Sequence, residues 1–336
     1  MIRYAGAFLL SGAIPLLYRL HPAAPLLLLP AILIVLLGSE LIARRGAVPA
    51  ALRTPAEYRL LPLLYIPVQL ALIGWATMAA AQASLPGLAA LVLSIGLTTG
   101  IFGMLTAHEM VHSTDRRERF WGALMLTGMT YRHFRVAHIF GHHRWAATER
   151  DAATARLHES FYAFLIRTVP AQLAEAWAFE NKRCARRQSP WLGNRVNHDL
   201  AIAVAVFAVA GWLAGPRGAA FLALESAVAI AVLEMFNYVA HYGLIRERDA
   251  GGSLEPFAPH HSWNSSNVLA NPIIFNMGRH SDHHTRPSVP YQTLRYIQEA
   301  PELPAGYAGS ILLALVPPLW RRIMDPKVQS FRAATR

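Results

Sequence analysis

The feature that most constrains this chain is a long stretch without charge: residues 60–107 contain no Lys, Arg, Asp or Glu. Soluble globular domains carry charge on about a quarter of their residues. Here 15% of the 336 residues are charged and 54% are hydrophobic. Crossing the hydrocarbon layer as a helix takes about 20 apolar residues. The sequence therefore predicts a multi-pass membrane protein and excludes a soluble globular fold.

We predict an all-α integral membrane protein with six transmembrane helices, folded as one membrane-embedded domain over residues 1–336. The apolar runs place the spans at residues 5–20, 23–42, 60–81, 85–107, 200–213 and 219–240. Segment 108–199 contains aromatic residues throughout, so we expect it to fold against the membrane face. The apolar run 312–320 is short and broken by two prolines, and it is expected to lie at the membrane interface.

The basic residues distinguish the two sides of the membrane. With six spans, 29 of the 31 Lys and Arg fall on the side that holds both termini, and only Arg19 and Arg217 fall on the other. The positive-inside rule then makes both termini and the segments 108–199 and 241–336 cytoplasmic. This placement accounts for the net charge of +11 without a nucleic-acid partner.

Histidine is the chemically informative residue type. The single cysteine, Cys184, excludes an internal disulfide, a cysteine-held zinc and an iron–sulfur cluster. Nine of the 15 histidines, by contrast, fall into four groups, two of which lie at the predicted cytoplasmic ends of spans four and six. The groups are His108 and His112; His138, His142 and His143; His241; and His280, His283 and His284.

The spacing within these groups predicts that several imidazoles aim at one point. Residues three or four apart share a helix face, so we expect His108 with His112, His138 with His142, and the His280 group to converge. Nine imidazoles exceed the needs of one metal ion, and neutral imidazole suits iron, zinc and copper. Two metal ions are the natural interpretation. Alone, His108-Glu109-x-x-His112 also matches a zinc-protease helix with Glu109 as general base, but that leaves seven clustered histidines unused.

Motifs around the histidines match a known family. They are His108-Glu-Met-Val-His112, Tyr131-Arg-His-Phe-Arg-Val136, Gly141-His-His-Arg144, His241-Tyr-Gly-Leu244, His261-Ser-Trp-Asn-Ser265 and Arg279-His-Ser-Asp-His-His284. From about Gly100 to Gln298 the chain resembles the membrane-bound alkane 1-monooxygenase family of the fatty-acid desaturase/hydroxylase superfamily. The His-Tyr-Gly and Arg-His-Ser-Asp-His-His elements separate this family from ordinary desaturases.

The resemblance implies a non-haem di-iron monooxygenase of the bacterial inner membrane. It would use O₂ to hydroxylate an unactivated C–H bond, typically a terminal methyl, of an alkane or similar apolar substrate. Electrons would come from NADH through a rubredoxin reductase and rubredoxin, which are separate chains. By the same resemblance, the ligands of two iron ions (Fe²⁺/Fe³⁺) are His108, His112, His138, His142, His143, His241, His280, His283 and His284.

Carboxylates next to the ligands should orient the rings and offset the metal charge. The candidates are Glu109, Asp151, Glu234 and Asp282. Glu234 lies on span six, seven residues before His241 and so on the same helix face, and an ionisable residue inside a span is a functional candidate. His133 is a further candidate for a side chain that contacts the ligands. His260 and His261 are expected to shape a loop or to contact the ligands, and not to bind metal themselves.

The chain departs from the family pattern at three positions: Ala137 and Ala240 stand where the family often has Glu, and Ser113 where Lys is usual. All nine candidate ligands remain. We interpret the chain as a divergent branch whose substrate is an aromatic methyl group, a functionalised chain or a lipid. Alternatives are a xylene-monooxygenase-like aromatic methyl hydroxylase, a fatty acyl desaturase, an intramembrane zinc protease and a non-catalytic metal transporter or sensor. A metal transporter or sensor would be expected to carry charged groups along its spans, and spans three and four have none.

Overall fold

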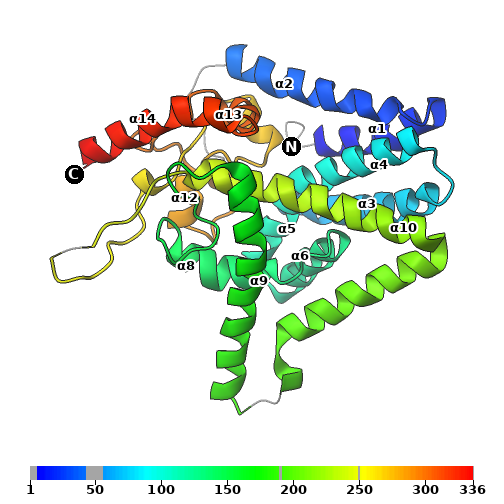
Figure 1. Ribbon diagram of the computed structural model, residues 1–336, viewed down its shortest axis with the longest axis horizontal. Coiled ribbons are helices and arrows are strands. Elements are labelled where there is room, and N and C mark those ends of the chain that lie inside the picture. Colours follow the sequence, from blue (N-terminus) through cyan, green and yellow to red (C-terminus); the bar gives the residue numbers. More distant parts are fainter. Residues whose placement is uncertain (1–5, 43–55, 189–190, 249, 336) are drawn as a thin grey trace.

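The computed structural model describes residues 6–42, 56–188, 191–248 and 250–335. This part of the chain consists of helices joined by loops, and its only extended pairings are two isolated bridges. The predicted all-α class is confirmed. The apolar helices lie roughly side by side, and α9 (Phe161–Arg186) crosses them near one end (Figure 1).

Within the described residues, three helical segments are long and apolar enough to cross a membrane: Tyr58–Ala80, Leu85–Val111 and Arg195–His241. The first lies in α3 (Ala56–Ala80), and the third is α10. The second is one continuous run built from α4 (Leu85–Thr98), the π-helical segment η3 (Thr99–Gly103) and α5 (Met104–Val111). Shorter apolar helices are α1 (Gly6–Leu20) and the pair η2 (Ala24–Leu27) and α2 (Leu28–Ile42).

The predicted fifth and sixth spans are the two arms of α10. The arms meet at Gly215, whose φ of 66° and ψ of −170° are non-helical, and Pro216 follows directly. Glycine adopts this backbone geometry without a Cβ clash, and proline cannot donate the next helical hydrogen bond. The chain therefore bends there (Figure 1). A total of six spans stays a prediction, and the cations Arg3, Arg44, Arg45 and Arg53 lie outside the described residues.

Gly96 in α4 and Gly100 in η3 bring this helical run close to α10. An added Cβ would lie 2.6 Å from the Val228 Cβ at Gly96, and 2.7 Å from the Val232 Cβ at Gly100. Small residues four apart on a helix allow this close approach in membranes, where packing rather than water exclusion holds helices together. The contact joins the helix that carries His108 to the helix that ends at His241.

A network of hydrogen bonds between buried polar side chains crosses the bundle. Ser11 Oγ and Tyr65 OH lie 2.7 Å apart, and Tyr65 donates to Gln69 Oε1 at 2.8 Å. Gln69 Nε2 then donates to Thr99 Oγ1 at 2.8 Å. Because lipid offers no hydrogen-bond partners, such groups must satisfy one another. The network connects α1 and α3 to the π-helical segment η3.

Most of the remaining elements gather at the end of the bundle where α5 and α10 finish. They are α6 (Arg116–Gly128), α7 (Phe134–Val136), η4 (Ala137–His142), α8 (His143–Trp145), η6 (Pro259–His261), α11 (Ala270–Ile273), α12 (His280–Thr285), η7 (Tyr291–Thr293), α13 (Gly306–Ala314) and α14 (Pro317–Thr335). The short segment η5 (Trp191–Gly193) instead lies between the end of α9 and the start of α10 (Figure 1). Ion pairs fix the start of α10: Asp199 binds both Arg132 and Arg135, and Glu180 of α9 binds Arg195.

Replacing Gly100 by Ala should destabilise the protein, because the new methyl group would overlap Val232 and the Ala229 backbone. Overpacking of this kind costs about 1–3 kcal/mol. The matched control is Gly74→Ala in α3, where an added Cβ meets nothing within 4 Å. Thermal unfolding in detergent should show a midpoint below that of the wild type for Gly100→Ala and no decrease for the control. Equal midpoints for the two variants would contradict the close packing of η3 against α10.

Candidate metal centre

The nine predicted histidines come together from four parts of the chain. His108 lies on the last turn of α5, and His112 caps that helix. The segments η4 and α8 carry His138, His142 and His143, and α10 ends at His241. The short helix α12 carries His280, His283 and His284. The predicted convergence of these segments at one end of the bundle is confirmed.

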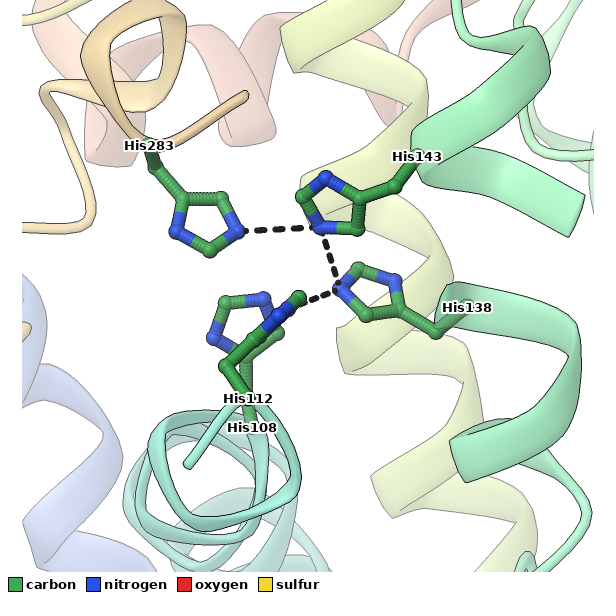
Figure 2. Close-up of side chains that lie close together, drawn as sticks. All are labelled: His108, His112, His138, His143 and His283. Carbon is green, nitrogen blue, oxygen red and sulfur yellow. Dashed lines mark hydrogen bonds between the residues drawn. The ribbon is translucent and has the colours of Figure 1, made fainter. Parts of the chain in front are cut away.

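Five of the imidazoles form one group: His108, His112, His138, His143 and His283. The Nε2 atoms of His138 and His112 lie 3.0 Å apart, as do those of His143 and His138. His283 Nε2 lies 3.1 Å from His143 Nε2. Figure 2 shows the five rings pointing toward a shared centre from α5, from η4 and α8, and from α12.

The other four imidazoles form a second group: His142, His241, His280 and His284. Nε2 of His280 lies 3.2 Å from that of His241 and 3.1 Å from that of His284. The Nε2 of His142 is buried and has no hydrogen-bond partner among the described residues. The two groups adjoin, because the His143 and His284 rings stack with centroids 4.5 Å apart.

The division into groups corrects the prediction that His138 and His142 aim at one point. His138 belongs to the five-membered group with His143, whereas His142 belongs to the four-membered group. The segment Ala137–His142 is π-helical, so residues five apart share its face. The same prediction was wrong for His280 and His283, which also fall into different groups.

The donor set fits metal ions. Two nitrogens bound to one ion at right angles, each 2.0–2.1 Å away, lie about 3 Å apart. The nearest Nε2 pairs are 3.0–3.2 Å apart. A neutral imidazole has one donor and one acceptor nitrogen, so Nε2 atoms that meet two others cannot all be paired by hydrogen bonds. A cation at each centre resolves this conflict.

The imidazoles on α12 are held in the neutral form that binds metals. Burial lowers the pKa of His280, His283 and His284 well below the usual range of histidine, and the neighbouring imidazoles lower it further. Metal binding requires a deprotonated ring nitrogen. At neutral pH no proton has to leave these rings before an ion binds.

Asp151 is the carboxylate that contacts a clustered histidine. Its Oδ2 lies 2.8 Å from His142 Nδ1 and accepts a hydrogen bond from Thr154 Oγ1 at 2.7 Å. Burial opposes the charge of Asp151, but His142 and Thr154 outweigh it and hold the pKa below its ordinary value. The carboxylate thus fixes the tautomer of His142, leaving Nε2 free to face the group centre.

The other predicted carboxylates lie farther from the rings. Glu234 is buried and accepts from Gln172 Nε2 at 2.7 Å and from Asn237 Nδ2 at 3.2 Å. Glu109 accepts from the Tyr291 backbone N–H at 3.3 Å. Within the described part of the chain, neither has a hydrogen bond to a clustered histidine.

Asp282 stands among the histidines of α12 but binds arginines. Its Oδ1 accepts from Arg286 Nε at 3.0 Å and from Arg295 Nη2 at 2.9 Å. These pairs hold the pKa of Asp282 below its ordinary value despite burial. Its carboxylate therefore anchors α12 to the following loop rather than orienting an imidazole directly.

The three remaining histidines named from the sequence lie outside the two groups. His133 is buried beside Tyr131, with ring centroids 4.4 Å apart, and burial lowers its pKa to about 4. His261 accepts from the Ala258 backbone N–H at 2.9 Å through Nδ1, and its Nε2 lies 3.0 Å from Glu255 Oε1. His260, His261 and Glu255 form a third, smaller cluster within the loop they shape.

Ala137 and Ala240, which stand at two of the three divergent positions, are buried in apolar surroundings. Ala137 packs with Val136, Ala176 and Val196. Ala240 is fully buried, and its carbonyl oxygen accepts from the backbone N–H of Trp263 at 2.8 Å. Neither position leaves a charge near the histidines.

An apolar cavity of about 480 Å³ reaches both histidine groups. Its wall includes His108 and His138 from the first group and His280 from the second. The rest is mostly aliphatic and comes from α2, α4 with η3 and α5, α10 and α13. The sequence does not show which residues line this cavity, because apolar residues that line a cavity follow the same pattern as those that face lipid.

Comparisons with known proteins agree with this geometry. The fatty acid desaturase family model matches residues 83–311. Alkane 1-monooxygenase 1 of Pseudomonas aeruginosa is 37% identical over 82% of this chain and 74% of its own length. Alkane 1-monooxygenase of Ectopseudomonas oleovorans is 41% identical, over 71% of this chain and 60% of its own length. The xylene/toluene monooxygenase hydroxylase component XylM of Pseudomonas putida is 28% identical over 71% of this chain and 64% of its own.

The family match covers the segment that holds all nine clustered histidines, and the alkane 1-monooxygenases are more similar to the chain than the xylene hydroxylase component is. The chain belongs to the fatty acid desaturase family, and within it to the membrane-bound alkane 1-monooxygenases.

Proposed function

We propose that this protein is a non-haem di-iron monooxygenase that hydroxylates the terminal methyl group of an alkane or a similar apolar chain. The observation that carries the proposal is the contact between the apolar cavity and both histidine groups. A hydrocarbon that fills the cavity would present its end to imidazoles of both groups at once.

The nine histidines would hold two iron ions, five imidazoles at one and four at the other. When bound, the ions would supply the activation of O₂ that C–H hydroxylation requires. The protein supplies the rest: Asp151 orients His142, the ion pairs of Asp282 hold α12, and the aliphatic wall positions the chain and excludes water. Excluding water protects a reactive centre from side reactions.

The membrane supports both substrate entry and electron supply. A hydrocarbon dissolves in the bilayer, and the cavity wall includes apolar side chains of helices α2 and α13. We place both termini and the metal centre on the cytoplasmic side of a bacterial inner membrane, because this side carries most of the basic residues. There rubredoxin, reduced by an NADH-dependent reductase, would deliver electrons as a separate chain.

Two of the alternatives account for less of the structure. A zinc protease that used His108, Glu109 and His112 would leave the four-membered group without a role. An aromatic methyl hydroxylase is favoured only by the xylene hydroxylase component, which is 28% identical, against 37% and 41% for the alkane enzymes.

Iron content tests the ligand assignment. The purified protein, loaded with Fe²⁺ anaerobically, should bind two iron ions per chain by elemental analysis. His142→Ala and His283→Ala remove one ligand from each group, and each should lower bound iron toward one per chain. His21→Ala is the matched control, since His21 is exposed and lies outside both groups. Two zinc ions and no iron, or full iron in both variants, would contradict the assignment.

Asp151→Asn should weaken iron binding while the fold persists. The variant keeps the shape of the side chain but loses the charge that orients His142. Losing such a partner costs about 10–100-fold in metal affinity. Competition with an iron chelator measures this affinity, and Glu149→Gln, on an exposed residue of the same segment, is the control. Identical affinities for the two variants would show that Asp151 has no role at the metal.

Product analysis tests the reaction itself. Membranes containing the protein, rubredoxin, its reductase and NADH should convert n-octane to a terminal alcohol that carries one labelled oxygen from ¹⁸O₂. Alkylbenzenes and fatty acyl substrates are assayed in parallel. An alkene without label would indicate a desaturase, and turnover restricted to alkylbenzenes would indicate an aromatic methyl hydroxylase.

A further inference from the structure

The exposed face of α9 is uncharged over most of its length, and neither the histidine groups nor the cavity accounts for this. Every exposed residue from Tyr162 to Ala178 lacks a charge. The largest of these side chains are Tyr162, Ile166 and Trp177, and Ile166 is 78% exposed. An uncharged exposed surface that extends along several helical turns marks a contact with a membrane or with another protein.

The last turns of α9 and its C-cap are cationic instead. Two cations near this end are neutralised inside the protein, because Arg183 and Arg195 both pair with Glu180. The exposed cations have no ion pair within the described part of the chain; they are Lys182, Arg186 and Arg187. We call these three exposed residues the basic end of α9.

The basic end lies beside the first turn of a long apolar helix. Glu180 Oε2 accepts a hydrogen bond from the Arg195 backbone N–H at 3.0 Å, and Asn194 Nδ2 donates to Asn181 Oδ1 at 2.8 Å. These contacts fix the end of α9 to the start of α10. Because α10 is long and apolar enough to cross a membrane, its charged first turn marks the level of the lipid headgroups.

The direction of α9 keeps the rest of the helix at the same level. It runs across the apolar helices near one end of the bundle rather than alongside them (Figure 1). A helix that crosses the ends of membrane spans runs along the membrane surface, and an amphipathic helix there buries its apolar face about 5–10 Å into the boundary between headgroups and acyl chains. Tyr162 and Trp177 suit this level, where aromatic side chains with a polar atom are enriched.

The uncharged surface continues beyond the start of α9. Tyr162 OH donates to the Leu315 carbonyl oxygen at 2.9 Å, which joins α9 to the junction of α13 and α14. Leu315, Val316 and Leu319 at this junction are all exposed. Two elements far apart in the sequence thus present apolar side chains next to each other, as expected if both contact lipid.

We propose that α9 lies in the headgroup layer of the membrane and that its basic end binds the phosphate groups of anionic phospholipids. The uncharged part of the exposed face anchors the helix at the acyl chains. The three cations, which lack counter-ions in the described part of the protein, meet the negative surface of the membrane, and arginine can bind a phosphate group through two hydrogen bonds. This inference concerns the lipid partner and does not depend on the proposed reaction.

Lipid binding to the purified full chain tests the basic end. Native mass spectrometry during titration with phosphatidylglycerol or phosphatidylcholine measures the affinity for each lipid. Wild type should bind phosphatidylglycerol at least about tenfold more tightly, because only this lipid carries a net negative charge. The triple variant Lys182→Gln, Arg186→Gln, Arg187→Gln should lose most of this preference.

A second triple variant removes the same charge elsewhere. It combines Arg156→Gln, Arg248→Gln and Lys327→Gln, which are exposed positions outside α9, and it should keep the preference for phosphatidylglycerol. Three results would each overturn the assignment: equal affinities of wild type for the two lipids, a preference that survives loss of the basic end, or an equal loss in both triple variants. Melting temperatures show whether each variant is folded.

A spin label on the exposed face measures its depth. Ile166→Cys is labelled in a Cys184→Ala background in nanodiscs, and the relaxation of the label is compared with oxygen and with a water-soluble nickel chelate. Oxygen concentrates in the hydrocarbon, so the label at position 166 should respond more to oxygen, as should one at Ile34→Cys on the exposed face of α2. Glu149→Cys, at an exposed charged position, should respond more to nickel. A label at position 166 that behaves like the one at position 149 would place this face in water.

An acidic protein is the competing partner for the basic end. Binding of rubredoxin to the protein in phosphatidylcholine nanodiscs is measured for wild type and for the variant that lacks the basic end. A variant that keeps its affinity for phosphatidylglycerol but no longer binds rubredoxin would assign the three cations to protein docking and overturn the lipid assignment. Loss of the lipid preference with rubredoxin binding intact is the expected result.

Discussion

The structure depends on one electrostatic constraint, the convergence of nine nitrogen lone pairs on two centres. Without cations, nitrogens 3.0–3.2 Å apart face one another with too few protons to share. The protein holds them together through elements that are fixed elsewhere: the ends of two long helices, a π-helical segment and a short helix anchored by arginines. Part of the folding free energy therefore maintains a site that is favourable only when metal is present.

The lipid environment explains why the site lies where it does. Inside the hydrocarbon layer, buried polar groups must satisfy one another, as the network from Ser11 to Thr99 does. Imidazoles whose nitrogens lack a hydrogen-bond partner would be unfavourable there. Beyond the ends of α5 and α10, loops and short helices supply the carboxylates and arginines that fix the site, such as Asp151, Asp282 and Arg295. The histidines there still contact an apolar cavity that extends between the long helices.

The sequence predicted the helical class, the long apolar helices and the identity of all nine clustered histidines. It did not predict how these histidines divide into a group of five and a group of four. Helical spacing pairs His138 with His142, but the π-helical turn pairs His138 with His143 instead. The ion pair between Asp282 and Arg295 could not be predicted from the sequence either, because Arg295 lies in a loop whose path depends on tertiary packing. Likewise, no periodicity shows which leucines of α2 line a cavity, since lipid and an alkyl chain select the same side chains.

The order of the clustered histidines along the chain has a consequence for biogenesis. The first is His108 and the last is His284, and each histidine group includes residues of α12. Synthesis proceeds from the N-terminus, so all the long apolar helices have been translated before either histidine group is complete. A nascent chain that stops short of residue 280 accordingly has neither complete group.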